Sequence, residues 1–252
     1  DEIICTLNTP VTSLPMSQSC SCMLERQIKV RGGEERRERE RRGERGERGG
    51  GERERKKGVA ALEAMGGARL GLSEAEMEIT VTQWRKANPR IVRLWRNLNE
   101  AATQALQTGR EIRLNRGLVV SRFRGMLRIV LPSGRSLMYP RAKVEKGTYG
   151  AEITYEGQNQ TTGQWETLRT YGGKLTENVV QAIARDILAE VLLRLDAEDA
   201  RIVFHVHDEV VVEIKKGTPL ANLEKHFANP PSWCQDMPLS GAGYETPYYK
   251  KD

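Results

Sequence analysis

The feature that most constrains the fold of this chain is a 28-residue segment with no apolar side chain. Every residue from Arg31 to Gly58 is Arg, Glu, Gly or Lys. Such a segment has no apolar surface to bury, so nothing offsets the roughly 1–2 kcal/mol per residue that ordering a backbone costs. Residues 1–30 mix Ser, Thr, Pro and scattered apolar residues without a period of 2 or 3.6. We therefore expect residues 1–57 to be a disordered, low-complexity N-terminus.

The same segment carries most of the net charge. Its ten Arg, two Lys and eight Glu leave four of the chain's six net positive charges there. The remainder is close to neutral, so global charge alone does not indicate a nucleic-acid or membrane partner. The four residue types are those that purine-only codons encode, which is typical of a translated polypurine repeat. Two interpretations stay open: an Arg/Gly arm that binds RNA or DNA, and a solvated segment, which the interleaved glutamates favour.

The sequence also bears on the compartment. It has no run of 18 uncharged apolar residues, and residues 1–29 lack a basic stretch followed by an apolar one. These patterns argue against a membrane span and a secretory signal. The four cysteines have no second Cys-x-x-Cys or histidine cluster to complete a zinc site. We expect a soluble, intracellular protein with free thiols and no membrane partner.

Beyond Gly58 the patterns predict an α+β fold. Ser73 and Glu76 form a capping box for a helix over 73–87, and Asn88-Pro89 begins a second helix that ends before Gly109. A long helix is predicted over 175–195, with Thr176 as its start signal. Strands are predicted at 127–131, 136–139, 153–155, 167–171, 202–206 and 210–214, and a short helix near 220–227.

The last two predicted strands are separated only by His207, Asp208 and Glu209. They form a hairpin with a histidine and two adjacent carboxylates at its tip. Such a tip can carry a divalent metal ion. On these three residues alone, turn chemistry explains an aspartate there equally simply.

This hairpin, preceded by a helix with Gln181 and Asp186 five residues apart, resembles the C-terminal palm of family A DNA polymerases, the DNA polymerase I type. Similar segments are Leu131–Pro140, Tyr171–Gln181, Met237–Leu239, Gly243-Tyr244, Gly58–Leu62 and Trp84–Pro89. The resemblance implies a palm-like antiparallel sheet whose motif C hairpin packs against long helices. Residues 58–110 are then partial fingers and residues 111–252 the palm.

The resemblance also implies a site and an activity. Asp208 holds the catalytic Mg²⁺ ions, Glu209 is its neighbour in the same motif, and His207 lies near the primer terminus. Gln181 reaches into the DNA minor groove. The implied function is DNA-directed DNA polymerase, by template-primed nucleotidyl transfer in DNA replication, with primer–template DNA and deoxynucleoside triphosphates as partners. Phosphoryl transfer of this kind uses two metal ions about 3.5–4 Å apart, held by oxygen ligands from more than one place.

Two parts of the family pattern are not found upstream of this region. These are the motif A strand, which supplies a second metal-binding aspartate, and the motif B helix, which contacts the incoming triphosphate. The Arg/Glu/Gly segment occupies their place, and Asp1 is the only aspartate before residue 58. We therefore expect an N-terminally truncated or mis-joined polymerase that is inactive alone and needs the missing N-terminal half as a partner.

Arginines give a further set of candidate DNA contacts. Arg185 follows Gln181 by one helical turn and either meets phosphate or belongs to a solvated helix face. Four more decorate the predicted β-rich region: Arg122, Arg124, Arg128 and Arg135. Near a duplex, such a cluster gives sequence-independent, salt-sensitive binding, whereas surface solvation is the simpler alternative.

Two other functions stay open. His205 and His207 alternate on one strand and could form a small metal-hydrolase site with Asp208, although a packed His205 is the more ordinary arrangement. The second alternative is a non-enzymatic nucleic-acid-binding protein that uses the basic arm and a degenerate palm. Binding that does not depend on Mg²⁺ would favour it.

Overall fold

The computed structural model describes residues 2–8, 58–60, 62–63, 69, 71–147 and 150–249. The helices are α4 (Glu74–Ala87), α5 (Pro89–Thr108), α6 (Gly172–Ala197) and α7 (Ala221–Ala228). Short 3₁₀ turns lie at Asn115–Gly117 and Ser232–Cys234. The strands are β1 (Glu2–Asn8), β2 (Ile112–Arg113), β3 (Val119–Phe123), β4 (Met126–Val130), β5 (Ser136–Tyr139), β6 (Lys143–Gly147), β7 (Gly150–Gln158), β8 (Trp165–Thr170), β9 (Arg201–Val206), β10 (Glu209–Lys215) and β11 (Ala242–Thr246).

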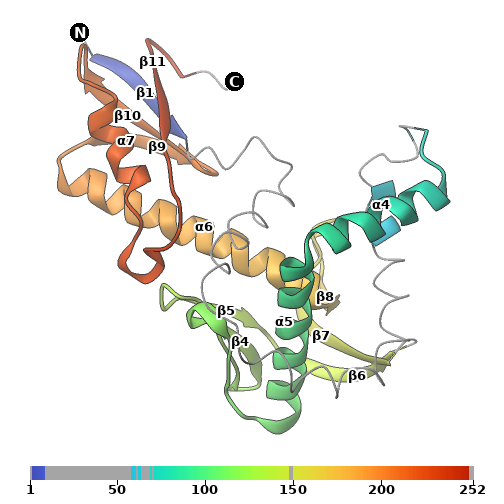
Figure 1. Ribbon diagram of the computed structural model, residues 1–252. Coiled ribbons are helices and arrows are strands. Elements are labelled where there is room, and N and C mark those ends of the chain that lie inside the picture. The colour runs from blue at the N-terminus through green and yellow to red at the C-terminus, as the bar shows by residue number, and fades with distance from the viewer. Residues whose placement is uncertain are drawn as a thin grey trace, which may run out of the picture.

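The strands form three antiparallel sheets, in the orders β11-β1-β10-β9, β2-β3-β4-β5 and β6-β7-β8. Figure 1 shows the long helix α6 running between two regions. The sheet β11-β1-β10-β9 and α7 lie at its C-terminal half, and the other two sheets lie with α5 at its N-terminal half. The predicted α+β class is therefore confirmed.

The first two helices begin and end where local chemistry predicts. The Ser73 hydroxyl accepts from the Glu76 amide, and the Glu76 carboxylate accepts from the Ser73 amide at 2.8 Å, so the capping box is confirmed. Gly109 closes α5 with φ at 71°, a left-handed conformation that glycine adopts without strain. Asn88 has a different role from the one predicted, because its side chain donates to the carbonyl of Trp84 and closes α4.

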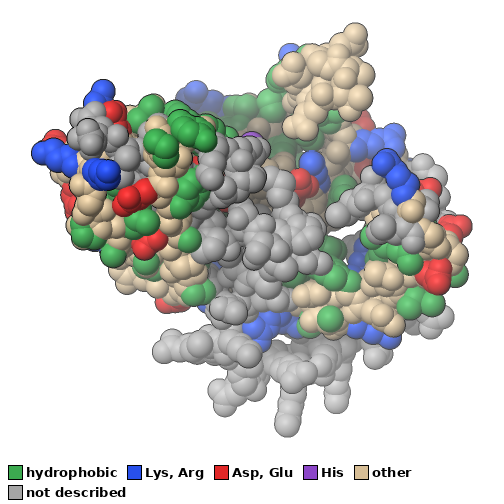
Figure 2. All heavy atoms as spheres, turned by 90° about the horizontal axis from the view of Figure 1, so that it is seen from above, with side chains coloured by type: hydrophobic (Ala, Val, Ile, Leu, Met, Phe, Trp, Pro, Cys, Tyr) green, Lys and Arg blue, Asp and Glu red, His purple; other side chains and the backbone are tan. Residues whose placement is uncertain are grey.

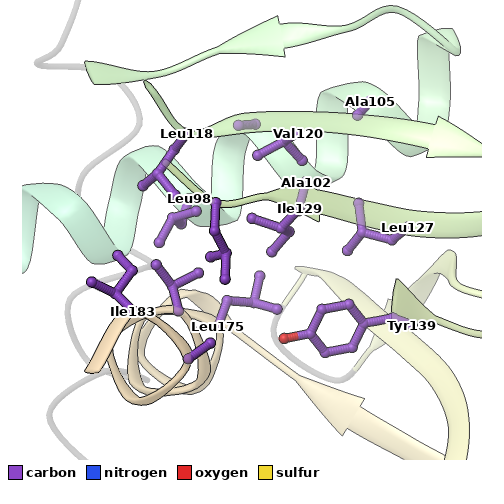
Figure 3. Close-up of a cluster of buried hydrophobic side chains, with 14 of the residues drawn as sticks. Leu98, Ala102, Ala105, Leu118, Val120, Leu127, Ile129, Tyr139, Leu175 and Ile183 are labelled. Atoms are coloured by element: carbon purple, nitrogen blue, oxygen red, sulfur yellow. The ribbon is translucent and has the colours of Figure 1, made fainter. Parts of the chain in front are cut away.

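A large hydrophobic core, which we call the α5 core, joins α5 to the sheet β2-β3-β4-β5 and to the first half of α6. Its fully buried side chains include Leu98, Leu127, Ile129 and Leu175, which meet in Figure 3. Tyr139 closes one side, with its hydroxyl accepting from the Asn178 amide at 3.0 Å. The predicted boundary between fingers and palm at residue 110 thus lies within one packed unit.

A smaller core, which we call the hairpin core, uses the second half of the same helix. Leu188, Val191 and Leu195 pack against the β10 side chains Val210, Val212 and Ile214 and against Leu223 and Phe227 of α7. Each β10 residue in this set is two positions from the next, so one face of the strand is buried against α6. The core changes at Ile187 and Leu188, adjacent residues of one helix.

The N-terminus of α6 lies against α5 at Gly172. A Cβ atom built on this glycine would stand 1.9 Å from the carbonyl oxygen of Trp95, so only glycine allows the approach. The Gly172 amide donates to the Asn99 side chain at 3.1 Å, which caps the helix from a neighbouring element. The helix therefore begins at Gly172, and Thr176 is not its start: the Thr176 hydroxyl donates to the Gly172 carbonyl within the first turn.

The expectation that residues 1–57 lack regular structure is wrong for Glu2–Asn8. These residues form β1, the strand between β10 and β11. A strand with a neighbour on both sides satisfies its backbone groups in two ladders, and both partners come from the far end of the chain, so no local pattern reveals it. The Arg/Glu/Gly segment lies outside the described residues, apart from Gly58. In the described part of the chain, no helix has both the length and the apolar character needed to cross a bilayer.

Candidate functional site

The candidate site lies at the tip of the β9–β10 hairpin, as predicted. The turn is shorter than expected: Glu209 is the first residue of β10 and pairs with Val206, so only His207 and Asp208 form the turn. His207 has φ at 50°, a left-handed conformation that histidine adopts more readily than most side chains. The hairpin therefore holds the three residues in fixed and different directions.

Asp208 is the available carboxylate at this tip. Its side chain is half-buried, and it makes no hydrogen bond or ion pair with any residue in the described ranges. His207 is exposed and equally unengaged within the same ranges. An anionic oxygen held on a rigid turn without a partner can accept a hydrogen bond or supply one metal ligand.

Glu209 is held differently. Its Oε2 accepts from the hydroxyl of Tyr249 at 3.4 Å, and the Tyr249 ring packs edge-on against Phe204 with centroids 4.9 Å apart. Burial raises the pKa of the Tyr249 phenol, and the nearby Glu209 charge raises it further, so the phenol stays a donor. Sequence reasoning missed Tyr249, because an aromatic residue in a Pro- and Tyr-rich tail has no pattern that points to a site.

One face of α6 is joined to the hairpin. Arg185 lies beside His205 of β9, with its two terminal nitrogens 3.3 and 3.2 Å from the two ring nitrogens. His205 is exposed, so the expectation of a packed histidine is wrong. Gln181 lies one helical turn before Arg185 on the same face, is exposed, and has no partner in the described residues. The structure thus brings Gln181, Arg185 and the hairpin to one side of the molecule.

Arg135 lies in a different arrangement, at the turn between β4 and β5. Its guanidinium forms an ion pair with Asp186 of α6 and donates to the Ala182 carbonyl at 2.8 Å. The Ser133 hydroxyl donates to the other oxygen of Asp186. The two residues of the α6 motif therefore have different surroundings. Gln181 is exposed, whereas Asp186 binds the β4–β5 turn through Arg135 and Ser133.

Arg128 lies on β4, away from the hairpin tip. Its Nε donates to the Ser121 hydroxyl at 3.2 Å, and its guanidinium carbon lies 4.7 Å from the centroid of the Phe123 ring. The four predicted DNA contacts, Gln181, Arg185, Arg128 and Arg135, thus do not form one cluster. In Figure 2, too, Lys and Arg side chains are scattered over the face shown and interleaved with acidic ones.

The described residues do not complete a metal site. No group of three or more His, Cys, Asp or Glu side chains among them is placed to hold an ion. β10 lies between β9 and β1. The register of β1 pairs Asn8 with Glu209 next to the turn and Glu2 with Lys215 at the other end of the strand. The β1 residue at the register position opposite Glu209 is therefore Asn8, and two metal ions would need a further carboxylate ligand.

Comparison with known proteins gives a match in sequence. Searched against models of protein families, the chain matches none. Over 198 residues, 77% of its length, it is 43% identical to a DNA polymerase of Bacillus phage SP02, of which it covers 30%. Among solved structures, it is similar to the polymerase domain of Pol1 from M. smegmatis in complex with DNA primer–template and dNTP. That similarity covers 97% of this chain and 39% of the other at 15% identity, with a TM-score of 0.45.

Proposed function

We propose that this chain, which is similar to a phage DNA polymerase, belongs to the DNA polymerases of family A and supplies the palm hairpin and an adjoining helix of an enzyme that performs template-primed nucleotidyl transfer in DNA replication. The observation that carries the proposal is the match to the phage polymerase over 198 residues. The proposed partners are primer–template DNA and deoxynucleoside triphosphates. The chain spans 30% of that relative's length.

The hairpin tip supports this proposal through the state of Asp208. A carboxylate that already had an ion pair would lose stabilisation on turning to a new ligand, whereas Asp208 has no such partner in the described residues. We assign Asp208 as the catalytic carboxylate, Glu209 as its fixed neighbour, and His207 as the residue nearest the primer terminus. The hydroxyl of Tyr249 donates to the Glu209 carboxylate.

The helix face of α6 supports the DNA-binding part. An exposed glutamine offers both donors and an acceptor, which suits the mixed acceptor and donor edge of a minor groove. Arg185 is already oriented by His205, so its remaining N–H groups can meet a phosphate without a further loss of side-chain freedom. Gln181 and Arg185 are therefore proposed to contact the duplex near the primer terminus.

Mg²⁺ is the proposed cofactor, and Asp208 is the residue of this chain that would bind it. Mg²⁺ commonly takes one or two carboxylates and fills its remaining positions with water and substrate phosphates. When bound, the ion would stabilise the charge that develops on the transferred phosphoryl group. Because the described residues do not complete the site, the other protein ligand must come from elsewhere in the enzyme.

The experiment that tests the proposal is complementation. Residues 58–252 should extend a primer when they are joined to the upstream part of the Bacillus phage SP02 polymerase, which must then supply the strand between β10 and β11 in place of β1. Asp208→Asn in that chimera should reduce extension by at least a thousandfold. Gln181→Ala should weaken primer–template binding with a smaller effect on the maximal rate. The loss of primer extension in His207→Ala should lie between those of Asp208→Asn and Gln181→Ala. The matched control is Asp196→Asn, an exposed aspartate at the far end of α6, which should leave extension unchanged.

Two results would contradict the proposal. An active chimera that is indifferent to Asp208→Asn would reduce Asp208 to a turn residue. A soluble, folded chimera that binds primer–template tightly without Mg²⁺ and never extends it would favour the non-enzymatic alternative. That alternative has one observation in its favour, namely that only one unengaged carboxylate lies at the tip among the described residues.

A further inference from the structure

The β3–β4 hairpin carries a cluster that the proposed function does not use. Its turn consists of Arg124 and Gly125, both with positive φ, at 48° and 78°. Positive φ at both central residues is typical of a tight two-residue hairpin. Arg124 and Arg128 both lie over the ring of Phe123, with guanidinium carbons 5.2 and 4.7 Å from its centroid. We call Phe123, Arg124 and Arg128 the arginine tip.

Among the described residues, no carboxylate neutralises the charges of the arginine tip. Many arginines of this chain lie within 4 Å of a carboxylate: Arg113, Arg116, Arg135, Arg141, Arg169, Arg194 and Arg201. In the described part of the chain, Arg124 and Arg128 have no such partner. Two cations over one ring, with no carboxylate beside them among the described residues, repel each other, and an anion relieves that repulsion.

The arginine tip also presents apolar surface. Phe123 remains 38% exposed although two guanidinium groups lie over it. On the neighbouring strand β5, Met138 pairs with Arg128 and is 38% exposed as well. Residues that pair directly across strands point to the same face, so Phe123, Met126, Arg128 and Met138 share one face of the sheet. The side of the sheet away from the α5 core therefore presents Arg128 between the exposed side chains of Phe123 and Met138.

This surface is separate from the hairpin tip that carries Asp208. The arginine tip and the β4–β5 turn are at opposite ends of β4, and it is the β4–β5 turn that Arg135 fastens to α6. A five-residue strand is about 17 Å long, so the turn residues of the arginine tip lie about that far along β4 from the β4–β5 turn, and Arg128 lies midway.

From these observations we propose that the arginine tip binds single-stranded nucleic acid. The guanidinium groups contact phosphates, and the exposed face of Phe123 and Met138 receives an unpaired base. Stacking on an aromatic ring together with arginine is the chemistry that holds single strands without sequence preference. A duplex meets only half of this surface, because its bases are stacked on one another and only its phosphates are available.

The source of the single-stranded nucleic acid rests on the function proposed above, because an enzyme that copies a template also handles the unpaired template beyond the primer. The proposed binding of single strands depends only on the residues of the arginine tip. It can therefore be measured on the full chain, without any polymerase activity.

The test is fluorescence anisotropy with a labelled 20-nucleotide oligothymidylate and, separately, a labelled blunt DNA duplex, across a range of salt concentrations. Phe123→Leu should weaken single-strand binding at least fivefold and duplex binding less than twofold, because one base–aromatic stack is lost. Arg124→Gln with Arg128→Gln should weaken both and should reduce the salt slope on the single strand by about 1.4. Phe123→Trp, which keeps an aromatic ring, should bind the single strand at least as tightly as the parent chain does.

The matched control removes the same charge elsewhere. Arg113 and Arg141 are 79% and 80% exposed and are ion-paired to Glu111 and Glu156, so Arg113→Gln with Arg141→Gln should leave the salt slope within about 0.3 of the original. Circular dichroism melting checks that each variant is folded. Equal losses from the two arginine pairs, or single-strand affinity that survives Phe123→Leu, would overturn the proposal. An inactive chimera with a working arginine tip would overturn only the polymerase assignment.

Discussion

The two cores along α6 differ in how far apart in the chain their parts lie. Most of the α5 core is built from consecutive elements between Leu98 and Ile187. The hairpin core lies beneath a sheet whose order is β11-β1-β10-β9, so strands from both ends of the described chain meet there. The comparison teaches that a site can lie on a short hairpin that local sequence predicts, while the sheet that supports this hairpin depends on distant segments.

The largest expected effect is in the α5 core, at Gly172. Gly172→Ala places a methyl group 1.9 Å from the Trp95 carbonyl oxygen in the present geometry, so α5 and α6 must separate. We expect a loss of about 3 kcal/mol or more in the free energy of unfolding, measured by chemical denaturation.

The neighbouring glycine is the control for this prediction. In Gly173→Ala the new methyl group meets only the ring of Tyr171, a side chain that can turn away, and the loss should stay below about 1 kcal/mol. Similar losses at both positions would mean that the close crossing of α5 and α6 is not what requires glycine at Gly172.

A second, smaller effect is expected in the sheet of the hairpin core. Cys5 lies in the middle of β1 and pairs with Val212 of β10 and Glu245 of β11. Cys5→Pro removes one backbone donor from this ladder and should cost about 2–3 kcal/mol. Hydrogen exchange should show faster opening of β10 and β11, with protection of β3 and β4 in the α5 core retained.

Cys5→Ala is the comparison for the proline variant, because it keeps the backbone donor. If the proline variant exchanges β3 and β4 as fast as β10, the two cores open together and α6 couples them. If β10 keeps its protection, β1 does not support the hairpin, and the order β11-β1-β10-β9 does not hold in solution.

The smallest effect compares a tyrosine from each region. Burial raises the pKa of Tyr139 in the α5 core, and burial with the Glu209 charge raises that of Tyr249. A pKa raised by folding contributes stability that is complete below the ordinary value near 10 and is lost as pH rises through the folded value. Stability should therefore decline above about pH 10 and less so in Tyr139→Phe.

Absorbance at 295 nm during a pH titration checks this prediction. Tyr139→Phe and Tyr249→Phe should each remove a component that titrates above the ordinary tyrosine range. A Tyr249→Phe variant whose titration matches that of the parent would mean that the contact with Glu209 is not formed in solution.

Most of the elements could be predicted from local sequence. The capping box at Ser73, the apolar stripe of α6 and the apolar run of β10 are each local patterns that a few neighbouring residues determine. β1 could not be predicted, because its stability comes from two partners about 200 residues away. The start of α6 was misplaced for a similar reason, since its cap is Asn99 of α5.

The site was predicted in part. The position of Asp208 on a hairpin follows from two apolar runs and the short gap between them. The tie between Arg135 and Asp186 could not be predicted, because residues 51 positions apart form an ion pair only after the sheet has packed on the helix. Nor could the contact of Tyr249 with Glu209 be predicted from either segment alone.

The placement of β1 has a consequence for the order of events during synthesis. A ribosome makes β1 before β10, and the roughly 200 residues between them take about 10–40 s at 5–20 residues per second. During that time the backbone groups of β1 have neither of their partners and are satisfied by water or by another chain. The α5 core can form before β1 has its partners. The last strands to pair are therefore β1, β10 and β11, which support the hairpin with Asp208.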